Sequence, residues 1–241
     1  MDALILAAGT GSRLVNLTRE LPKALVQVAG RPLVDYTLDF VHTLGCDKIV
    51  VVGGFYFDKL QAHLSGKKNI RLLENKDFLK GSILTLAKGL PEMNDSFILM
   101  NVDHIYPKRL ARTFAASQAK LTEISAFVDF DRPLQEDDMK VQLADGKTIG
   151  RISKGLHEFD AGYIGMTYVP ARRLEIYREA ALQLAQENEC AVVENLLQRL
   201  IEQGNPPEIF PVSGTRWLEV DNQWDLQNAK RILKWVEDFL D

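Results

Sequence analysis

Hydrophobic positions in this chain form short runs that alternate with segments of helical period. The runs at 3–8, 48–54 and 96–103 are apolar over most of their length, as expected of strands covered on both faces of a sheet. Segment 32–45 opens with proline, closes with glycine and repeats apolar residues near helical spacing, which predicts a helix. This alternation predicts a parallel, doubly wound α/β sheet with right-handed crossovers.

Weaker patterns complete the first half of the chain and change in character after it. We expect one strand and three helices in the first half, at 69–75 and at 57–64, 82–90 and 108–119. After residue 120 three β-rich segments follow, at 123–130, 139–153 and 159–169. Asp145-Gly146 suits a hairpin turn inside the second of them, so we expect antiparallel or mixed strands that extend the sheet.

The last third of the chain predicts two helices, two short strands and a closing helix. The helices are expected at about 171–187 and 190–203, and the strands at 209–212 and 216–220. The closing helix begins at Asn222, and Asp225 three residues later makes a capping-box-like arrangement. Its apolar stripe consists of Trp224, Ala229, Ile232, Val236 and Phe239. No internal repeat, linker or low-complexity tract interrupts the chain, which favours a single domain over 1–241.

The composition is that of an ordinary soluble globular protein, with 46% hydrophobic and 26% charged residues. The net charge is −4, whereas a general nucleic-acid binder would be basic, so we expect no nucleic-acid partner. An anionic ligand would have to be held by local positive groups. Cys46 and Cys190 lie among apolar residues and outside any CxxC or zinc spacing, so we expect two buried free thiols.

The start of the chain and its hydropathy predict where the protein works. The apolar run after Met1 has no basic region before it and is soon broken by glycine, unlike a signal peptide. No stretch approaches the roughly 18 apolar residues that a membrane span needs. We therefore expect a cytoplasmic protein with no membrane span.

A glycine-rich loop, LAAGTGSRL, directly follows the first predicted strand. Gly9 and Gly11 remove side chains where the backbone approaches something closely, and such a loop can point several N–H groups at one anion. Arg13 and Lys23 add positive charge, which completes the parts of a triphosphate cradle. The alternative is a tight turn with a solvated arginine. The loop is neither Walker A nor GxGxxG, because Leu14 stands where the last glycine would be.

Two aspartates end predicted strands far apart in the sequence, Asp103 in MNVDHIYP and Asp221 in WLEVDNQWDL. Ligand sites in open α/β sheets lie at the carboxyl ends of strands. Two carboxylates there can hold one Mg²⁺ that offsets the repulsion between two reacting phosphates. The alternatives are a turn residue for Asp103 and a helix cap for Asp221. Glu219, on the same strand face as Asp221, is a weaker third candidate.

The blocks LILAAGTGSRL and LPKALVQVAGRPLVDYTLD resemble the signature of nucleotidyltransferases that make sugar and alcohol diphosphonucleosides, which runs LAAGxGxRL, PKxL and GxPLL. The resemblance implies a three-layer Rossmann-like fold whose mostly parallel, mixed sheet carries a β-rich acceptor-binding insertion. Residues 1–120 would form the nucleotide-binding half and 121–241 the acceptor-binding half. The implied site has catalytic Arg13 and Lys23, metal-binding Asp103 and Asp221, and nucleotide-binding Leu6, Ala8, Gly9, Thr10, Gly11, Ser12, Gly81 and Ser82.

Over essentially its full length the chain is similar to the CTP:inositol-1-phosphate cytidylyltransferases. The matching segments are FLKGSILTLAKGL, FILMNVDHIYP, MKVQLADGKTIGRISKGLHEFDAGYIGMTYV and RWLEVDNQWDL. Asp103-His104 matches the Asp-His pair at that family's metal strand, and Lys154, Leu156 and Asp160 match its Lys-x-Leu segment before an aspartate. That family's Gly-Asn-Gly-x-Ser-Leu is reduced here to KGSIL, which leaves the base preference and the acceptor open.

This similarity implies a Mg²⁺-dependent enzyme that transfers CMP from CTP to the phosphate of a small alcohol phosphate. Inositol 1-phosphate is the first acceptor, with CDP-inositol and pyrophosphate as products. Phosphocholine, 2-aminoethylphosphonate, a sugar 1-phosphate and another nucleotide base remain alternatives, and a homodimer is left open. A non-catalytic nucleotide binder would have lost the charged residues of the motifs, but Arg13, Lys23, Asp103 and Asp221 are all present. A glycosyltransferase with a DxD metal motif would carry two acids where this chain reads Asn101-Val102-Asp103.

The acceptor phosphate is the nucleophile and is already ionised at neutral pH, so catalysis would rest on positioning and electrostatics without a general base. Lys154 is the candidate for holding the acceptor phosphate, with a solvated hairpin lysine as the alternative. Asp160 either binds acceptor hydroxyls or begins a strand. His104 either organises the metal site or packs. Glu194 is expected on a helix near the pocket rim, with no role assigned.

Overall fold

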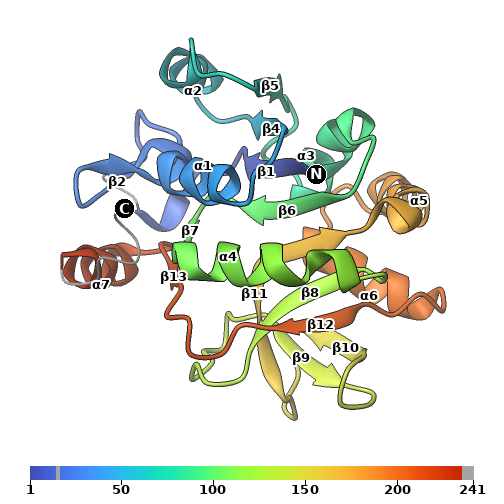
Figure 1. The fold of residues 1–241 in the computed structure, drawn as a ribbon. Helices are drawn as coiled ribbons and strands as arrows, with labels where there is room; N and C mark the ends of the chain where they lie inside the picture. The colour runs from blue at the N-terminus through green and yellow to red at the C-terminus, as the bar shows by residue number, and fades with distance from the viewer. Residues whose placement is uncertain (15–16, 235–241) are drawn as a thin grey trace.

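The computed structural model describes residues 1–14 and 17–234, and its centre is a nine-stranded mixed sheet (Figure 1). The strand order is β10-β9-β11-β6-β1-β4-β5, with β8 beside β11 and β12 beside β8. The parallel part consists of β1 (Asp2–Ala7), β4 (Lys48–Gly53), β5 (Ile70–Glu74) and β6 (Phe97–Asn101). β1 lies between β4 and β6, with Ile5 opposite Val51 and Met100. The predicted α/β fold with a mainly parallel central sheet is confirmed.

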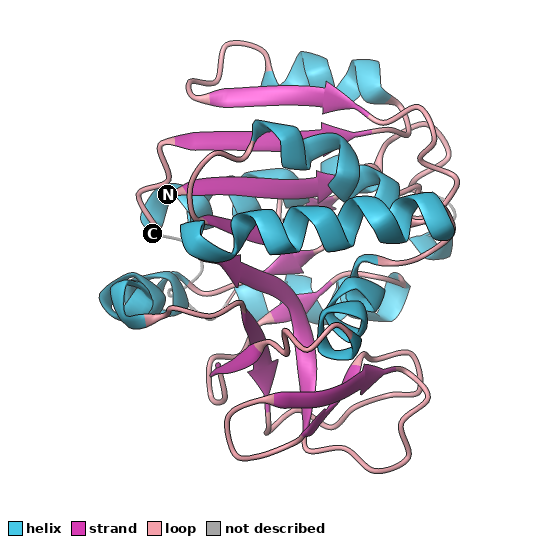
Figure 2. Ribbon diagram, turned by 90° about the vertical axis from the view of Figure 1, so that its right-hand side faces the viewer, coloured by secondary structure: helices cyan, strands magenta, loops and turns pink. Residues whose placement is uncertain are grey.

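Alternate residues of β1 divide the core between the two faces of the sheet. Ala3, Ile5 and Ala7 pack in one cluster with α1, α2 and α4, and Leu4 and Leu6 pack in a second cluster with α3, α5 and α6. Neighbouring side chains of a strand point to opposite faces, so a run that is apolar at every position needs helices on both sides. Three layers result (Figure 2).

The helices of these layers have the following bounds. They are α1 (Leu33–Thr43), α2 (Phe57–Leu64), α3 (Ser82–Gly89), α4 (Lys108–Ser117), α5 (Leu174–Glu187) and α6 (Val193–Glu202). Short 3₁₀ helices are η1 (Ser12–Leu14), η2 (Lys23–Leu25), η3 (Leu90–Glu92), η4 (Gln118–Lys120) and η5 (Ala171–Arg173). None of the helices within 1–14 and 17–234 is long and apolar enough to cross a bilayer.

The β-rich second half extends the sheet through one long strand, β11 (Ala161–Val169), which pairs antiparallel with β6 and β8. The other strands are β8 (Ser125–Asp129), β9 (Lys140–Leu143), β10 (Ile149–Ser153) and β12 (Glu208–Pro211). β9 and β10 form the predicted hairpin. The Asp145 carboxylate closes its turn by accepting from the backbone N–H groups of Lys147 and Thr148 at 2.9 and 2.7 Å.

The strand predicted at 216–220 is present but shorter. Only β13 (Leu218–Glu219) is extended, and it pairs antiparallel with β7 (His104–Ile105) in a two-stranded ribbon outside the main sheet. Leu218 and Val220 pack in a third cluster with the closing helix, which holds this segment away from the sheet. A second ribbon consists of β2 (Gln27–Val28) and β3 (Arg31–Pro32).

The closing helix, α7 (Gln223–Leu233), begins as its sequence predicts. The Asn222 side chain accepts from the backbone N–H groups of Trp224 and Asp225 at 2.8 and 3.1 Å. The Asp225 carboxylate in turn accepts from the Asn222 N–H at 3.1 Å. Each partner satisfies an amide that has no intrahelical acceptor, so the predicted capping box is confirmed.

The predicted apolar stripe of α7 is wrong at its first member. Trp224 is 72% exposed. The buried positions follow a spacing of three and four residues and are Leu226, Ala229 and Leu233, and Trp224 lies on another face of the helix. Ile232 packs against this cluster as a partly buried residue. Val236 and Phe239 lie outside the described residues.

The two cysteines differ in exposure. Cys46 is buried in the core as predicted, but Cys190 is exposed, so the prediction of two buried thiols is wrong. Cys190 lies in the loop between α5 and α6, where Ala191 and Val193 are buried and the thiol is not. Apolar neighbours in sequence do not bury a residue when the loop alternates between the core and solvent.

Candidate active site

The glycine loop leaves the sheet at the carboxyl end of β1 and tightens at Gly11. This residue has φ +65°, and a Cβ on it would lie 2.9 Å from Thr18 Cγ2 and 3.1 Å from Lys23 Cβ. Its carbonyl accepts from the Leu14 N–H at 2.8 Å and from the Thr18 hydroxyl at 2.9 Å. Glycine is therefore required where the loop turns back over Lys23. A Cβ on Gly9 would meet no described atom within 4 Å, which leaves the loop backbone open to a ligand there.

Lys23 lies at the centre of a charged cluster and is 6% exposed. Its Nζ donates to Asp103 Oδ2 at 2.6 Å and to Asp221 Oδ1 at 2.5 Å. Arg13 Nη1 donates to the second Asp221 oxygen at 2.5 Å. The structure therefore brings together the two basic and the two acidic residues predicted from the motifs. Asp221 does not cap α7, because the Asn222 side chain does so.

The ribbon of β7 and β13 brings Asp103 and Asp221 together. His104 lies opposite Glu219 in its register, and the Val220 N–H donates to the Asp103 carbonyl at 2.9 Å. Asp103 directly precedes β7. Asp221 comes two positions after Glu219, which is the last residue of β13. In an antiparallel pair the start of one strand faces the end of the other, so both aspartates emerge at the same end of the ribbon.

The charges of this cluster stabilise one another. Burial by itself would lower the pKa of Lys23, but the carboxylates of Asp103 and Asp221 outweigh burial and hold that pKa well above its ordinary value. Burial would raise the pKa of Asp103, but Lys23 and His104 hold it well below its ordinary value. At neutral pH the lysine is therefore an ammonium and Asp103 is a carboxylate.

Asp103 and Asp221 fit a hard divalent cation. An oxygen of each converges on one cationic group, the Lys23 ammonium, at 2.6 and 2.5 Å. Oxygen ligands of this kind suit Mg²⁺, which keeps water and phosphate oxygens as its other ligands. In the described part of the chain no three acidic, histidine or cysteine side chains form a ready-made metal group.

His104 both packs and orients a carboxylate. Its ring is stacked against Tyr106 and Trp217, with centroids 5.7 and 5.5 Å away. Its Nδ1 lies 2.7 Å from Asp103 Oδ1. Gly165, with φ +72°, makes room for the ring, because a Cβ there would lie 2.9 Å from His104 Cε1. Burial would lower the pKa of His104, but Asp103 outweighs it and raises that pKa.

A cavity of about 200 Å³ adjoins the two aspartates and contains Lys154. It lies between the main sheet and the β-rich insertion, since Tyr163 and Gly165 of β11 also line it. Its acidic lining residues are Asp103, Asp137, Asp138, Glu194, Glu219 and Asp221. Three of these were not singled out as site residues by any motif: Asp137, which pairs with Arg13 Nη2 at 2.8 Å, Asp138 and Glu194. Burial raises the pKa of the Glu194 carboxyl.

Of the predicted site residues, Asp103, Lys154 and Asp221 line this cavity, and Asp160, Gly81 and Ser82 are among those that do not. Asp160 is exposed, and its carboxylate accepts from the Leu143 N–H at 2.8 Å, so it joins β9 to the start of β11. Gly81 and Ser82 contact the loop between α5 and α6. No local pattern of residues indicates these partners, because each lies in a distant segment.

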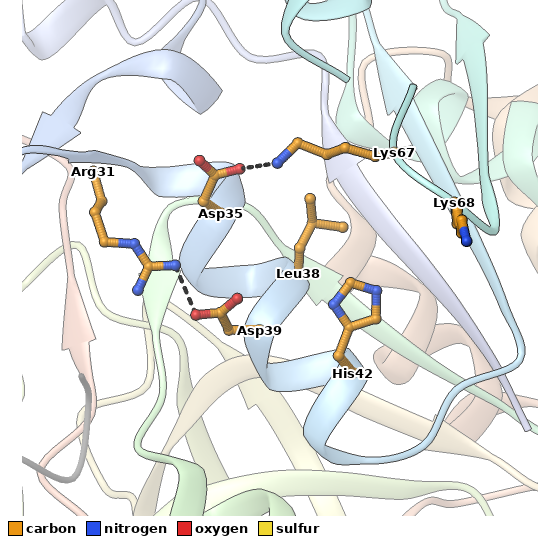
Figure 3. Close-up of a pocket in the computed structure, with 7 residues that line it drawn as sticks. All are labelled: Arg31, Asp35, Leu38, Asp39, His42, Lys67 and Lys68. Atoms are coloured by element: carbon orange, nitrogen blue, oxygen red, sulfur yellow. Dashed lines mark hydrogen bonds and ion pairs between the residues drawn. The ribbon is translucent and has the colours of Figure 1, made fainter. Parts of the chain in front are cut away.

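Another hollow, of about 350 Å³, lies on the outer side of α1 and is drawn in Figure 3. Four of its charged side chains form two ion pairs. Arg31 donates to Asp39 at 2.6 Å and Lys67 donates to Asp35 at 3.1 Å. None of the residues that line it belongs to the Lys23 cluster or lines the cavity beside Asp103.

Residues 3–135 match the family model described as the MobA-like NTP transferase domain. The chain belongs to this family. The match begins in β1 and covers the glycine loop, Lys23 and Asp103, which are the parts of the site that lie in the first half of the chain. The protein is therefore a nucleotidyltransferase.

Relatives and solved structures extend the similarity to the rest of this MobA-like transferase. The CTP:phosphoglutamine cytidylyltransferase of Campylobacter jejuni is 26% identical, over 94% of this chain and 98% of its own. The bifunctional IPC transferase and DIPP synthase of Aquifex aeolicus is 28% identical, over 96% of this chain and 51% of its own. The inositol-1-phosphate CTP transferase of T. maritima superposes with a TM-score of 0.80 at 20% identity, over 98% of this chain and 97% of its own.

Proposed function

We propose that this protein is a Mg²⁺-dependent cytidylyltransferase that transfers CMP from CTP to the phosphate of a small alcohol phosphate. Family membership gives the reaction class, and the similarity to cytidylyltransferases along the whole chain supports CTP as the donor. Inositol 1-phosphate is the first acceptor, because the similar T. maritima structure is that of an inositol-1-phosphate CTP transferase. Residues 1–120 would bind the nucleotide and 121–241 most of the acceptor.

The observation that carries the proposal is the Lys23 cluster. Two carboxylates and two cationic side chains meet beside an open glycine loop, with Lys23 Nζ 2.6 and 2.5 Å from Asp103 and Asp221. A triphosphate needs cationic groups and a divalent metal, and a metal needs carboxylate oxygens. This cluster supplies both kinds of group in one place.

In the proposed reaction an oxygen of the acceptor phosphate attacks the α-phosphorus of CTP. The new P–O bond forms as the bond between the α-phosphorus and the bridging oxygen breaks, and pyrophosphate leaves with that electron pair. The attacking oxygen is already ionised, so no side chain has to remove a proton. Arg13 and Lys23 neutralise the triphosphate and the leaving pyrophosphate, and Lys154 holds the acceptor phosphate. Asp103 and Asp221 would hold the Mg²⁺, and the bound ion would supply further charge neutralisation.

The acidic lining of the cavity favours a second class of acceptor. Lys154 and His104 are its basic residues, against six carboxylates. Glu194 faces the cavity from the first turn of α6 and is not part of the Lys23 cluster. A carboxylate in such a place is stabilised by an ammonium group or by hydroxyl donors of the acceptor. Phosphocholine and 2-aminoethylphosphonate carry an ammonium group at the end away from the phosphorus, and inositol 1-phosphate carries hydroxyl groups away from its phosphate.

The test is pyrophosphate release in the presence of Mg²⁺, with CTP, UTP, dTTP, ATP and GTP each combined with a panel of acceptors. The panel contains inositol 1-phosphate, phosphocholine, 2-aminoethylphosphonate and glucose 1-phosphate. We expect release with CTP and one alcohol phosphate, at least about 100-fold faster than with the other nucleotides. Release with CTP and an ammonium acceptor alone would move the substrate to the second class. Release with a different nucleotide alone would overturn the assignment of CTP.

A further inference from the structure

The start of α3 is bound to the loop that leads into α6. Two backbone bonds join them, from Gly81 N–H to the Glu189 carbonyl at 2.8 Å and from Ile83 N–H to the Ala191 carbonyl at 3.1 Å. The Val193 N–H donates to the Ser82 hydroxyl oxygen at 2.9 Å. The Lys80 ammonium pairs with Glu189 at 2.9 Å. We call residues 80–83 and 189–193 together the α3–α6 clamp.

Gly81 is required by the closeness of this contact. Its backbone has an ordinary φ of −70°, so conformation alone does not call for glycine. A Cβ on Gly81 would lie 2.0 Å from the Ala191 carbonyl oxygen and 2.4 Å from the Cys190 carbonyl carbon. These are backbone atoms, which cannot move aside as a flexible side chain can. The glycine therefore lets the two backbones touch.

The clamp ends at the wall of the acceptor cavity. Val192 and Glu194 line that cavity together with Lys154 and Asp103. Val193 is the first residue of α6, and its N–H has no intrahelical acceptor, so the Ser82 hydroxyl takes the place of a helix cap. Ser82 thus holds the first turn of α6 from outside the helix, while Asn195 Oδ1 accepts from the Val192 N–H at 2.9 Å within it, and Glu194 follows Val193 in that turn.

We propose that Ser82 is a positioning residue for the acceptor, which it serves by holding Glu194 in place through the α6 N-terminus. The proposal rests on the proposed function, because it assigns the cavity beside Lys154 to the acceptor. It differs from the role implied by resemblance, in which Gly81 and Ser82 contact the nucleotide. Ser82 Oγ accepts from the protein's own Val193, on the cavity side of the clamp.

The kinetic test compares Ser82→Ala with Ser82→Thr and with the matched control Ser117→Ala. The Ser117 hydroxyl donates to carbonyls of its own helix, α4, and no residue of α4 lines the cavity. Ser82→Ala should raise KM for the acceptor about five- to tenfold and leave KM for CTP within about twofold. Ser82→Thr keeps the hydroxyl and should restore the acceptor KM. A rise in KM for CTP with an unchanged KM for the acceptor would overturn the proposal.

A second measurement does not depend on activity. Hydrogen exchange of peptides covering 188–197 should be faster in folded Ser82→Ala than in the wild type, and Ser82→Thr and Ser117→Ala should match the wild type. If the exchange rate of these peptides is unchanged in Ser82→Ala, the Ser82 hydroxyl does not hold the α6 N-terminus and the proposal fails. If the wild type releases no pyrophosphate with any acceptor, the proposed function fails, and the exchange data still decide whether Ser82 holds the α6 N-terminus.

Discussion

The ammonium of Lys23 lies 2.6 Å from a carboxylate oxygen of Asp103, although 80 residues separate the two in the chain. Lys23 comes from the segment after the glycine loop, and Asp103 follows the strand β6. A loop lysine in solvent would contribute little to stability, but this one is 6% exposed and bonded to two carboxylates. The same side chain therefore matters to the fold and to the proposed chemistry.

Lys23→Met should lower turnover at least about 100-fold and also destabilise the protein in the absence of metal. Removing one partner of a buried charge pair costs about 3–5 kcal/mol, and we expect about 2 kcal/mol here because Asp103 and Asp221 side chains are 22% and 31% exposed. Thermal unfolding in EDTA measures the loss. Mg²⁺ should recover part of it, because it replaces the missing cation between the carboxylates. A variant as stable as the wild type in EDTA would contradict the assigned pairing.

Asp103→Asn and Asp221→Asn should each abolish Mg²⁺-dependent turnover and weaken metal binding by at least about tenfold. Mn²⁺ binding in the presence of CTP, followed by electron paramagnetic resonance, reports the metal without requiring turnover. Asp47→Asn is the control, since Asp47 is 88% exposed and pairs only weakly with the chain terminus at 3.5 Å. A wild-type Mn²⁺ titration in either site variant would remove that aspartate from the metal site.

The pH dependence of stability follows from the direction of the Asp103 pKa. Because the folded-state pKa lies below its ordinary value of 3.8, the stabilisation is complete above 3.8 and is lost as the pH falls through the folded-state pKa. Asparagine does not titrate. The difference in free energy of unfolding between wild type and Asp103→Asn should shrink as the pH falls below 3.8, and it should also fall as the pH rises through the titration of His104, whose pKa Asp103 raises. Urea unfolding at each pH measures it, and a flat difference down to about pH 2 would refute the pairing.

Lys23 sets the alkaline limit of the same cluster. Its folded-state pKa is raised above the ordinary value of 10.5, so its stabilisation is complete below 10.5 and is lost as the pH rises through the folded-state pKa. The two limits leave the charged cluster intact throughout the neutral range. Activity losses near neutral pH should therefore come from the substrates' own phosphates and not from Lys23 or Asp103.

Glu194→Gln should change the choice of acceptor more than the use of CTP. With an ammonium acceptor, kcat/KM should fall about 10- to 100-fold, because the opposite charge is lost. With inositol 1-phosphate the fall should stay below about tenfold, since an amide oxygen still accepts from a hydroxyl. Glu202→Gln at the exposed end of α6 is the matched control. Equal KM values for every acceptor in wild type and Glu194→Gln would exclude contact between Glu194 and the acceptor.

The two thiols should react at very different rates. Burial raises the pKa of the Cys46 thiol to about 12, whereas Cys190 is exposed in the loop before α6. Ellman's reagent should therefore titrate one thiol in the native protein and both after unfolding. Cys190→Ser should abolish the fast reaction, and turnover should survive both Cys46→Ser and Cys190→Ser. Two fast thiols in the native protein would contradict the burial of Cys46.

Local patterns predicted most of the fold correctly. The continuous apolar runs became β1, β4 and β6 in the middle of the sheet, because a strand covered on both faces has no polar side. Asn222 and Asp225 formed the predicted cap, which needs only neighbours within three residues. The prediction failed at Trp224 and Cys190, where burial depends on which neighbour covers a residue.

The alternating α/β elements, the glycine loop and the charged residue types can be read from the chain alone, since each depends on residues close together in it. Which of these charges meet depends on the folded arrangement. Lys23 and Asp221 are 198 positions apart, and their contact follows from the register of β7 with β13. In the structure Glu194 also lines the cavity, and the Asp160 carboxylate accepts a hydrogen bond from a backbone N–H of β9. Such contacts depend on loop closure and packing between distant segments, which no local spacing of residues specifies.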